Sequence, residues 1–202
     1  MNANLAQDGT SCRDLLKLGA LAGGGLLLGI GLGGCSKPAA LGGAGGQPVA
    51  WLRIGGDDSI TVFVDKSEMG QGVYTALTQL LAEELEVDWK KIRWEYAPIA
   101  QVYANGGLQG TVGSSAIRNT YTPMRQAGAV ARELLIQAAA QKWGVDKAQC
   151  KAESSSVVNT ATGARLSYGS LADAASKLTP PAANAIQLKS ANDWKLVGKP
   201  TK

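Results

Sequence analysis

The feature that most constrains how this sequence can fold is a change of hydrophobic period between residues 60 and 85. Ile60–Val64 is a short β-branched run with alternating character, and it predicts a strand. Between Val73 and Leu85 the apolar residues recur at helical spacing, which predicts an amphipathic helix. A strand and a helix that each have one apolar side bury these sides together, so we expect layered packing.

Further strands are expected on both sides of this pair. Ala50–Ile54 is predicted to form a hairpin with Ile60–Val64, because the Gly and Asp residues of Gly55–Ser59 favour a tight turn. After the helix, Ile92–Ala97 alternates between apolar and polar residues and predicts another strand, which ends at Pro98.

The second half of the chain is organised around one long predicted helix. We expect it to run from Ser114 to Lys142, with Pro123 as the place where it could be interrupted, and to end at Gly144. Beyond it we expect short strands at Cys150–Ala152, Val157–Asn159, Arg165–Ser167, Ala185–Lys189 and Trp194–Val197, and a helix at Leu171–Lys177 capped by Ser170. This order of elements predicts an α/β or α+β layered fold.

The composition excludes several kinds of site. The chain has no His, which rules out a Ser–His–Asp triad, a His general base and His-ligated zinc. Its three Cys form no CxxC pair, so we expect no iron–sulfur cluster or zinc site in this chain. The formal charge of +4 comes from scattered basic residues without interleaved aromatic residues, so we do not expect nucleic-acid binding.

Residues 1–35 have the pattern of an export leader and are predicted to lie outside the fold. A polar start precedes a Gly/Leu/Ala run from Leu18 to Leu32, which is short for a membrane span and typical of a signal peptide. Ser11–Lys17 resembles the twin-arginine export signal, except that Cys12 replaces the first Arg.

The end of this leader also resembles a bacterial lipobox. Small residues precede Cys35, which would be lipidated and would tether the protein to a membrane. The alternative is a signal peptide in which this Cys occurs by chance. We therefore expect a leader at 1–35, a flexible tether at 36–49, a folded part at 50–202 and a periplasmic protein.

Two glycine-bearing loops each open one of the longer predicted helices, and we call them the first corner (Glu68–Gly72) and the second corner (Thr111–Ser115). Glycine lets backbone N–H groups approach a ligand closely, and the first turn of a helix leaves N–H groups unpaired. Such places suit phosphate or another anion. Taken alone, each corner is more often a structural turn, and Ser114 or Ser115 is more often an ordinary N-cap.

Together, the two corners resemble the molybdopterin-binding large subunits of the xanthine dehydrogenase/aldehyde oxidase superfamily. The sequence Glu-Met-Gly-Gln-Gly, an amphipathic helix, a strand, and Thr-x-Gly-Ser-Ser opening a long helix stand in the order that this family shows. The chain is most similar to the isoquinoline 1-oxidoreductase beta-subunit and aldehyde dehydrogenase type. This resemblance implies oxidation of aldehydes or N-heterocycles with water as the oxygen donor, and it makes 50–202 part of a molybdopterin-binding domain.

The resemblance also implies roles for individual residues. Gln71 would hydrogen-bond an oxo ligand of the molybdenum without binding the metal directly, and Gly70 and Gly72 would pack against the pterin. The dinucleotide part of the cofactor, typically molybdopterin cytosine dinucleotide in bacteria, would lie against Thr111, Gly113, Ser114 and Ser115. For Arg118 and Arg125, which share a helix face, solvated or salt-bridged roles are favoured over phosphate binding.

One part of the family pattern is missing from this chain. The family's catalytic base is a glutamate in a Gly-Glu motif, whereas Glu133 is predicted mid-helix, Glu153 in a turn, and Glu68 is not that base. The resemblance therefore implies that this chain holds no catalytic residue and acts with the remainder of the large subunit or a second chain. A [2Fe–2S] small subunit and a cytochrome electron acceptor are the further partners it implies. The alternative function is a non-catalytic exported lipoprotein or scaffold that retains the fold.

Overall fold

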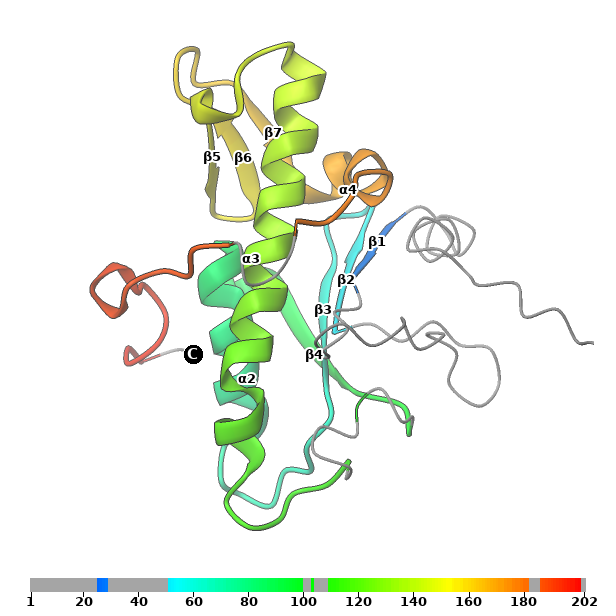
Figure 1. Cartoon of the computed structure of the whole chain (residues 1–202), viewed down its shortest axis with the longest axis vertical. Helices are drawn as coiled ribbons and strands as arrows, with labels where there is room; N and C mark the ends of the chain where they lie inside the picture. The colour runs from blue at the N-terminus through cyan, green and yellow to red at the C-terminus, as the bar shows by residue number, and fades with distance from the viewer. Residues whose placement is uncertain (1–24, 29–50, 100–102, 104–108, 182–185, 201–202) are drawn as a thin grey trace, which may run out of the picture.

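The computed structural model of this chain describes residues 25–28, 51–99, 103, 109–181 and 186–200. These residues form one sheet with strands β1 (Gly25–Leu28), β2 (Leu52–Gly55), β3 (Ile60–Val64) and β4 (Ile92–Tyr96), and a second with β5 (Cys150–Glu153), β6 (Ser156–Asn159) and β7 (Arg165–Ser167) (Figure 1). The α-helices are α2 (Val73–Leu85), α3 (Ala116–Trp143) and α4 (Tyr168–Ser176). This arrangement confirms the predicted α/β or α+β fold. Among the described helices, none has the length and the hydropathy that crossing a bilayer requires.

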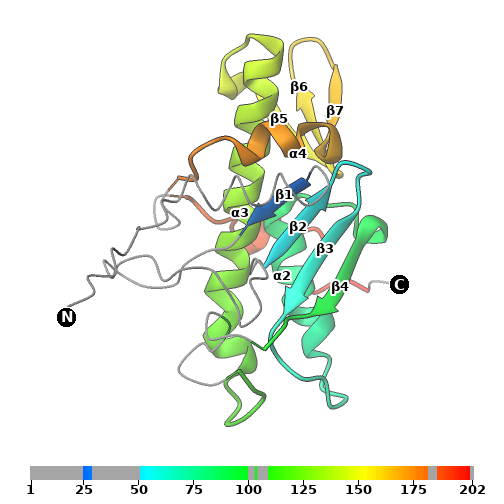
Figure 2. The same cartoon turned by 90° about the vertical axis from the view of Figure 1, so that its right-hand side faces the viewer.

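The four-stranded sheet combines antiparallel and parallel pairing. β2 and β3 form the predicted hairpin, and β3 pairs in parallel with β4. A parallel pair needs a crossover connection. The helix α2 forms this crossover from β3 to β4, and it covers one face of the sheet (Figure 2). The bounds of α2 are those that the hydrophobic period predicted, and Leu77, Leu81 and Leu85 of its apolar stripe are completely buried.

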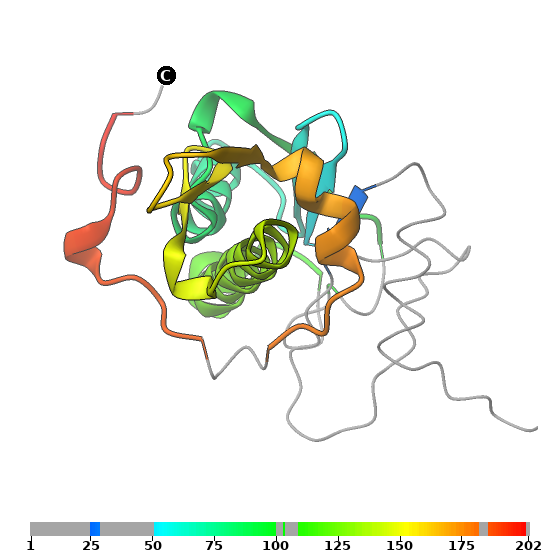
Figure 3. The same cartoon turned by 90° about the horizontal axis from the view of Figure 1, so that it is seen from above.

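The long helix α3 lies beside α2 on the same face of the sheet (Figure 3). The two backbones lie close together at Gly128, where a Cβ would lie only 2.3 Å from the carbonyl oxygen of Leu81. Pro123 lies inside α3 without ending it, so the possible interruption does not occur. The helix ends as predicted at Gly144, which adopts the left-handed conformation with φ 65°.

The prediction that residues 1–35 lie outside the fold is wrong for β1. Gly25–Leu28 pairs antiparallel with the whole of β2, from Gly25 opposite Gly55 to Leu28 opposite Leu52, and Leu26 is completely buried. A short apolar run is compatible with a signal peptide and with a buried strand, and its pattern alone does not distinguish them. The rest of the predicted leader and the tether 36–49 lie outside the described residues.

The predicted cap of the short helix α4 is also wrong. α4 begins three residues before Leu171, and the side chain of Ser167, not Ser170, accepts from a first-turn amide, that of Ser170. Tertiary contacts decide this start. The hydroxyl of Tyr168 donates to the carbonyl oxygen of Leu85 at 2.6 Å, and the amide of Gly169 donates to Asp58 Oδ1 at 2.7 Å.

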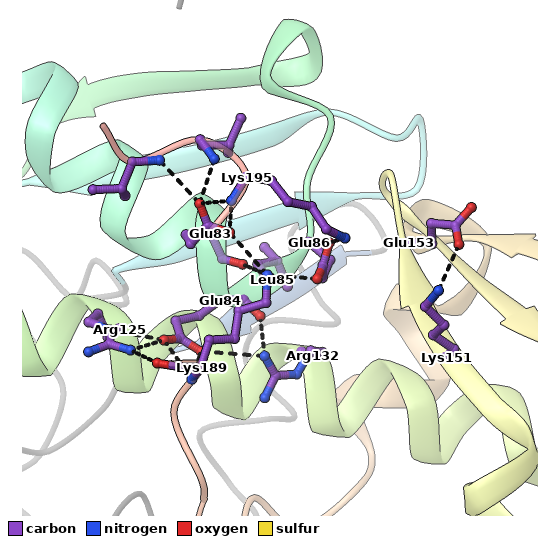
Figure 4. Close-up of polar contacts among 12 residues, drawn as sticks. Glu83, Glu84, Leu85, Glu86, Arg125, Arg132, Lys151, Glu153, Lys189 and Lys195 are labelled. Carbon is purple, nitrogen blue, oxygen red and sulfur yellow. Dashed lines mark hydrogen bonds and ion pairs between the residues drawn. The ribbon is translucent and has the colours of Figure 1, made fainter. Parts of the chain in front are cut away.

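The described C-terminal segment, Ile186–Pro200, contains no strand, contrary to the predicted strands at Ala185–Lys189 and Trp194–Val197. We call it the C-terminal strap. Its amides donate to buried carboxylates of α2 instead of a neighbouring strand: Lys189 N reaches Glu84, and Lys195 N reaches Glu83 (Figure 4). A segment whose amides are taken by side chains cannot pair them in a sheet.

Candidate functional site

The two corners lie together in space, at the end of α3 opposite the three-stranded sheet (Figure 1). They border one pocket of about 430 Å³ at the starts of α2 and α3. Of the predicted site residues, five line this pocket: Gln71, Thr111, Gly113, Ser114 and Ser115. Gly70 and Gly72 belong to the first corner but do not line the pocket. Among the described residues, no acidic or basic side chain lines it.

Ser67, the residue directly before the first corner, is hydrogen-bonded to Thr111 of the second corner. The amide of Ser67 donates to Thr111 Oγ1 at 2.7 Å, and that hydroxyl donates to the carbonyl oxygen of Ser67 at 3.0 Å. The Ser67 hydroxyl also hydrogen-bonds the phenol of Tyr96 at the end of β4. Thr111 therefore has a structural role that sequence reasoning did not reveal, because its partner is far away in the sequence.

We expected the backbone amides of the first corner to lack hydrogen-bond partners within the chain, but they have one. Glu68 Oε1 accepts from the amides of Gly70 at 2.9 Å and Gly72 at 2.8 Å, and Glu68 Oε2 accepts from Tyr74 at 3.1 Å. The amide of Tyr74, together with those of Gly72 and Gly70, holds the pKa of the Glu68 carboxyl below its usual range. A Glu just before a helix start was the sequence signal for this contact, since negative charge is favoured there.

Gln71 has one fixed orientation. Its Oε1 accepts from the amide of Met69 at 2.6 Å, and its Nε2 donates to the carbonyl oxygen of Ser67 at 2.9 Å. Exchanging oxygen and nitrogen would set donor against donor and acceptor against acceptor, so the network decides the assignment. A carboxamide has two N–H donors. One N–H of Gln71, which lines the pocket, therefore has no partner among the described residues.

The second corner is built differently. Gly113 and Ser114 have φ values of 60° and 52°, as in a type I′ turn, and the Ser115 amide donates to Val112 O at 3.2 Å. Ser115 stands at the N-cap position of α3, but its hydroxyl donates to the same carbonyl and caps no amide. Since the first turn of α3 also has no acidic residue, no carboxylate of its own competes for the helix's first N–H groups.

A buried ion pair lies directly before the first corner. Asp65 and Lys66 follow β3, and both side chains are almost fully buried. Asp65 Oδ2 lies 2.9 Å from Lys66 Nζ without hydrogen-bond alignment, and burial raises the pKa of the Asp65 carboxyl. The strand pattern gave no indication of this pair.

Other charged residues serve structure. Arg125 pairs with Glu84 at 2.6 Å, which confirms the salt-bridged role for Arg125, and Arg118 is exposed. Glu133 pairs with Lys147, and Glu153 pairs with Lys151 and Arg165; neither glutamate lines the corner pocket. The described residues contain no group of three or more His, Cys, Asp or Glu that could hold a metal ion.

A larger hollow of about 850 Å³ lies between α3, β5 and the C-terminal strap, toward the other end of α3. Its lining mixes both signs of charge, and several of these residues pair with one another, such as Glu86 with Lys189. Because most of its charges are paired and no predicted site residue lines it, we take the smaller corner pocket as the candidate site.

Comparisons with known proteins bear on this site. The model of a family described as molybdopterin cofactor-binding domain matches residues 17–201. The chain is 33% identical over 155 residues to a membrane-bound aldehyde dehydrogenase (pyrroloquinoline-quinone) of Gluconacetobacter polyoxogenes, covering 75% of this chain and 19% of that protein. It is 34% identical over 129 residues to isoquinoline 1-oxidoreductase subunit beta of Brevundimonas diminuta, covering 62% and 16%.

A solved structure of CO dehydrogenase from Oligotropha carboxidovorans is also similar. Its TM-score is 0.49 at 20% identity, over 61% of this chain and 15% of that chain. The chain spans less than a fifth of the length of each of these relatives.

Proposed function

This chain belongs to the molybdopterin cofactor-binding domain family, and from that premise we propose that it is the cofactor-binding part of a molybdenum hydroxylase. The proposed assembly oxidises aldehydes or N-heterocycles with water as the oxygen donor. The names of the aldehyde dehydrogenase and isoquinoline oxidoreductase relatives support these substrate classes. One of these names includes pyrroloquinoline-quinone; for the cofactor we follow the family model, because it matches nearly the whole chain.

The observation that carries this proposal is the convergence of both corners on one pocket without a charged side chain. Gln71 offers a fixed N–H there, and the second corner offers the start of an uncapped helix. At Gly113, nothing lies within 4 Å of the place that a Cβ would take, so a ligand can approach the backbone closely. Neutral donors and a helix start fit a pterin cofactor that carries phosphate groups.

Each predicted site residue has a part in this proposal. Gln71 would donate its remaining N–H to an oxo ligand of the molybdenum, and Gly70 and Gly72 allow the turn that holds Gln71 in place. The second corner would line the dinucleotide part, for which we propose the cytosine form: Thr111 positions the corner, and Gly113, Ser114 and Ser115, which line the pocket, would face the ligand. When bound, the molybdenum cofactor supplies the two-electron redox chemistry.

The contacts of two glutamates and of one cysteine support the partners that we propose for this chain. Glu133 and Glu153 are engaged in ion pairs away from the pocket, so we propose that the general base comes from the remainder of the large subunit or from a second chain. Cys150 is a buried free thiol whose pKa is raised by burial. We therefore propose that a [2Fe–2S] small subunit carries the iron–sulfur relay. A cytochrome as the final acceptor is a separate part of the proposal.

We also propose a periplasmic location, with export through the twin-arginine-like signal and tethering through Cys35. Cleavage before Cys35 would remove β1 from the mature protein and expose the edge of β2. Labelled acyl chains should be incorporated by the wild type and not by Cys35→Ser. Labelling that persists in the variant would contradict lipidation at this residue.

The experiment that tests the proposed function is co-expression of this chain with the remainder of the large subunit, followed by metal and nucleotide analysis. We expect molybdenum and, after acid hydrolysis, CMP in the purified complex. A complex that is folded but contains neither molybdenum nor CMP would contradict the proposal.

A further inference from the structure

The carboxylate of Glu68 lies where a bound anion would lie in the first corner. It accepts from two glycine amides and from Tyr74 in the first turn of α2, at 2.8–3.1 Å. Amides of a glycine turn and a helix start are the donors that phosphate groups use in proteins. In this chain a side chain of the corner itself already satisfies them.

The same loop conformation also fixes the side chain of Gln71. With the chain turned back on Glu68, the amide of Met69 and the carbonyl of Ser67 both reach the Gln71 carboxamide. Ser67 O also accepts from Thr111 Oγ1, so it links the first corner to the second. Glu68 thus holds the loop in the conformation that orients the Gln71 carboxamide. Glu68 itself does not line the pocket.

We infer that Glu68 is a positioning residue: it occupies the anion place of the first corner, excludes the cofactor's phosphate groups from it and fixes the outward N–H of Gln71. This inference rests on the proposed function for what binds in the pocket. The two corners then have different tasks. The first presents one oriented carboxamide, and the second, which has no carboxylate of its own, takes the anionic part.

Two physical effects support this division. A carboxylate attached to the loop has a high effective concentration at these amides, so a free phosphate competes poorly with it. A phosphate that entered beside an ionised Glu68 would also meet like-charge repulsion. The depressed pKa of Glu68 means that it stays ionised throughout the neutral range.

The test is amide NMR of the full chain with inorganic pyrophosphate as the probe. In the wild type, the amides of Gly70, Gly72 and Tyr74 should titrate with the Glu68 carboxyl, with a midpoint below the usual Glu range. At neutral pH they should not shift when pyrophosphate is added. In Glu68→Gln this titration should vanish, and the side-chain amide signals of Gln71 should move toward their positions in an unstructured peptide.

The matched control is Glu95→Gln, which removes an exposed carboxylate of β4 that pairs with Arg53 of β2 across β3 and should leave all these signals unchanged. The inference is overturned if the three amides of the wild type show no acid titration, or if pyrophosphate shifts them at neutral pH. Failure of the proposed function appears separately, as an absence of pyrophosphate shifts at Gly113–Ser115. The acid titration needs no ligand and remains measurable in that case.

Discussion

Glutamate carboxylates hold backbone amides at both ends of α2, but one of these places is open to solvent and the other is buried. Before the helix, the partly exposed Glu68 accepts from amides of its own loop. In the last turns, Glu83 and Glu84 are 2% and 0% exposed and accept from amides more than 100 residues away in the C-terminal strap (Figure 4).

The difference shows how burial changes what the same contact does. Burial pushes the pKa of Glu83 up, but the amides of Leu196 and Lys195 and the ammonium of Lys189 outweigh it, so this pKa lies below its usual range. Glu84 is offset by Arg125 and Arg132. Such a buried carboxylate is costly to leave unpaired, so it governs stability. The solvent-exposed carboxylate of Glu68 contributes less to stability and governs the shape of a binding loop.

The largest expected effect comes from Glu84→Ala. Arg125 and Arg132 would keep their nearly buried positions without their shared carboxylate, and we expect a loss of about 3–5 kcal/mol in the free energy of unfolding. Urea denaturation measures it. Glu153→Ala, which removes an exposed carboxylate that also pairs with two cations, is the control and should cost far less. Equal losses in the two variants would contradict the role of burial.

The second prediction tests the helix contact that lies between the two carboxylate sites. Gly128→Ala would place a methyl group 2.3 Å from Leu81 O, which is backbone and can move only with α2. We expect a loss of about 1–3 kcal/mol in the free energy of unfolding, typical of overpacking. Thr122→Ala, at an exposed position of α3, should stay within about 0.5 kcal/mol of the wild type. An unchanged urea midpoint for Gly128→Ala would contradict the close approach of the helices.

The third prediction concerns acid. Because the pKa of Glu83 is lowered in the folded chain, its stabilising contribution is complete above the unfolded Glu pKa of about 4.3 and is lost as pH falls through the folded value. The urea midpoint of the wild type should therefore fall on acidification below that pH, and the fall should be shallower in Glu83→Gln. Glu68→Gln should alter this slope less, since solvent screens its site. Parallel slopes for the wild type and Glu83→Gln would refute this assignment.

The smallest effect on stability is expected for Ser114→Asp, which gives the second corner a carboxylate like that of the first. Asp tolerates the left-handed φ of this position, so we expect a change within about 0.5 kcal/mol in the free energy of unfolding. Pyrophosphate binding should weaken by about tenfold, or ~1.4 kcal/mol, through like-charge repulsion. Ser170→Asp on the exposed start of α4 is the control. Unchanged binding in Ser114→Asp would mean that the second corner does not take the anion.

Much of the fold could be predicted where a residue's neighbours in the sequence are also its structural partners. The apolar spacing of Val73–Leu85 predicted α2 with its observed bounds, and Ile60–Val64 predicted β3. Gly144 marked the end of α3 because helices often end at a residue in the left-handed conformation, which glycine adopts without a steric penalty. The two corners were likewise visible as glycine turns before helices, although their amide partners were not.

The sequence by itself determined the local elements, the absence of His and CxxC chemistry, and the position of both corners before helices. Only the tertiary structure decided that Gly25–Leu28 completes a sheet, that the strap's amides reach Glu83, and that Glu68 rather than a free ligand meets the first corner's amides. Local patterns report the period of the backbone, whereas the partner of a carboxylate or a strand edge depends on which segments the whole fold brings within hydrogen-bond distance.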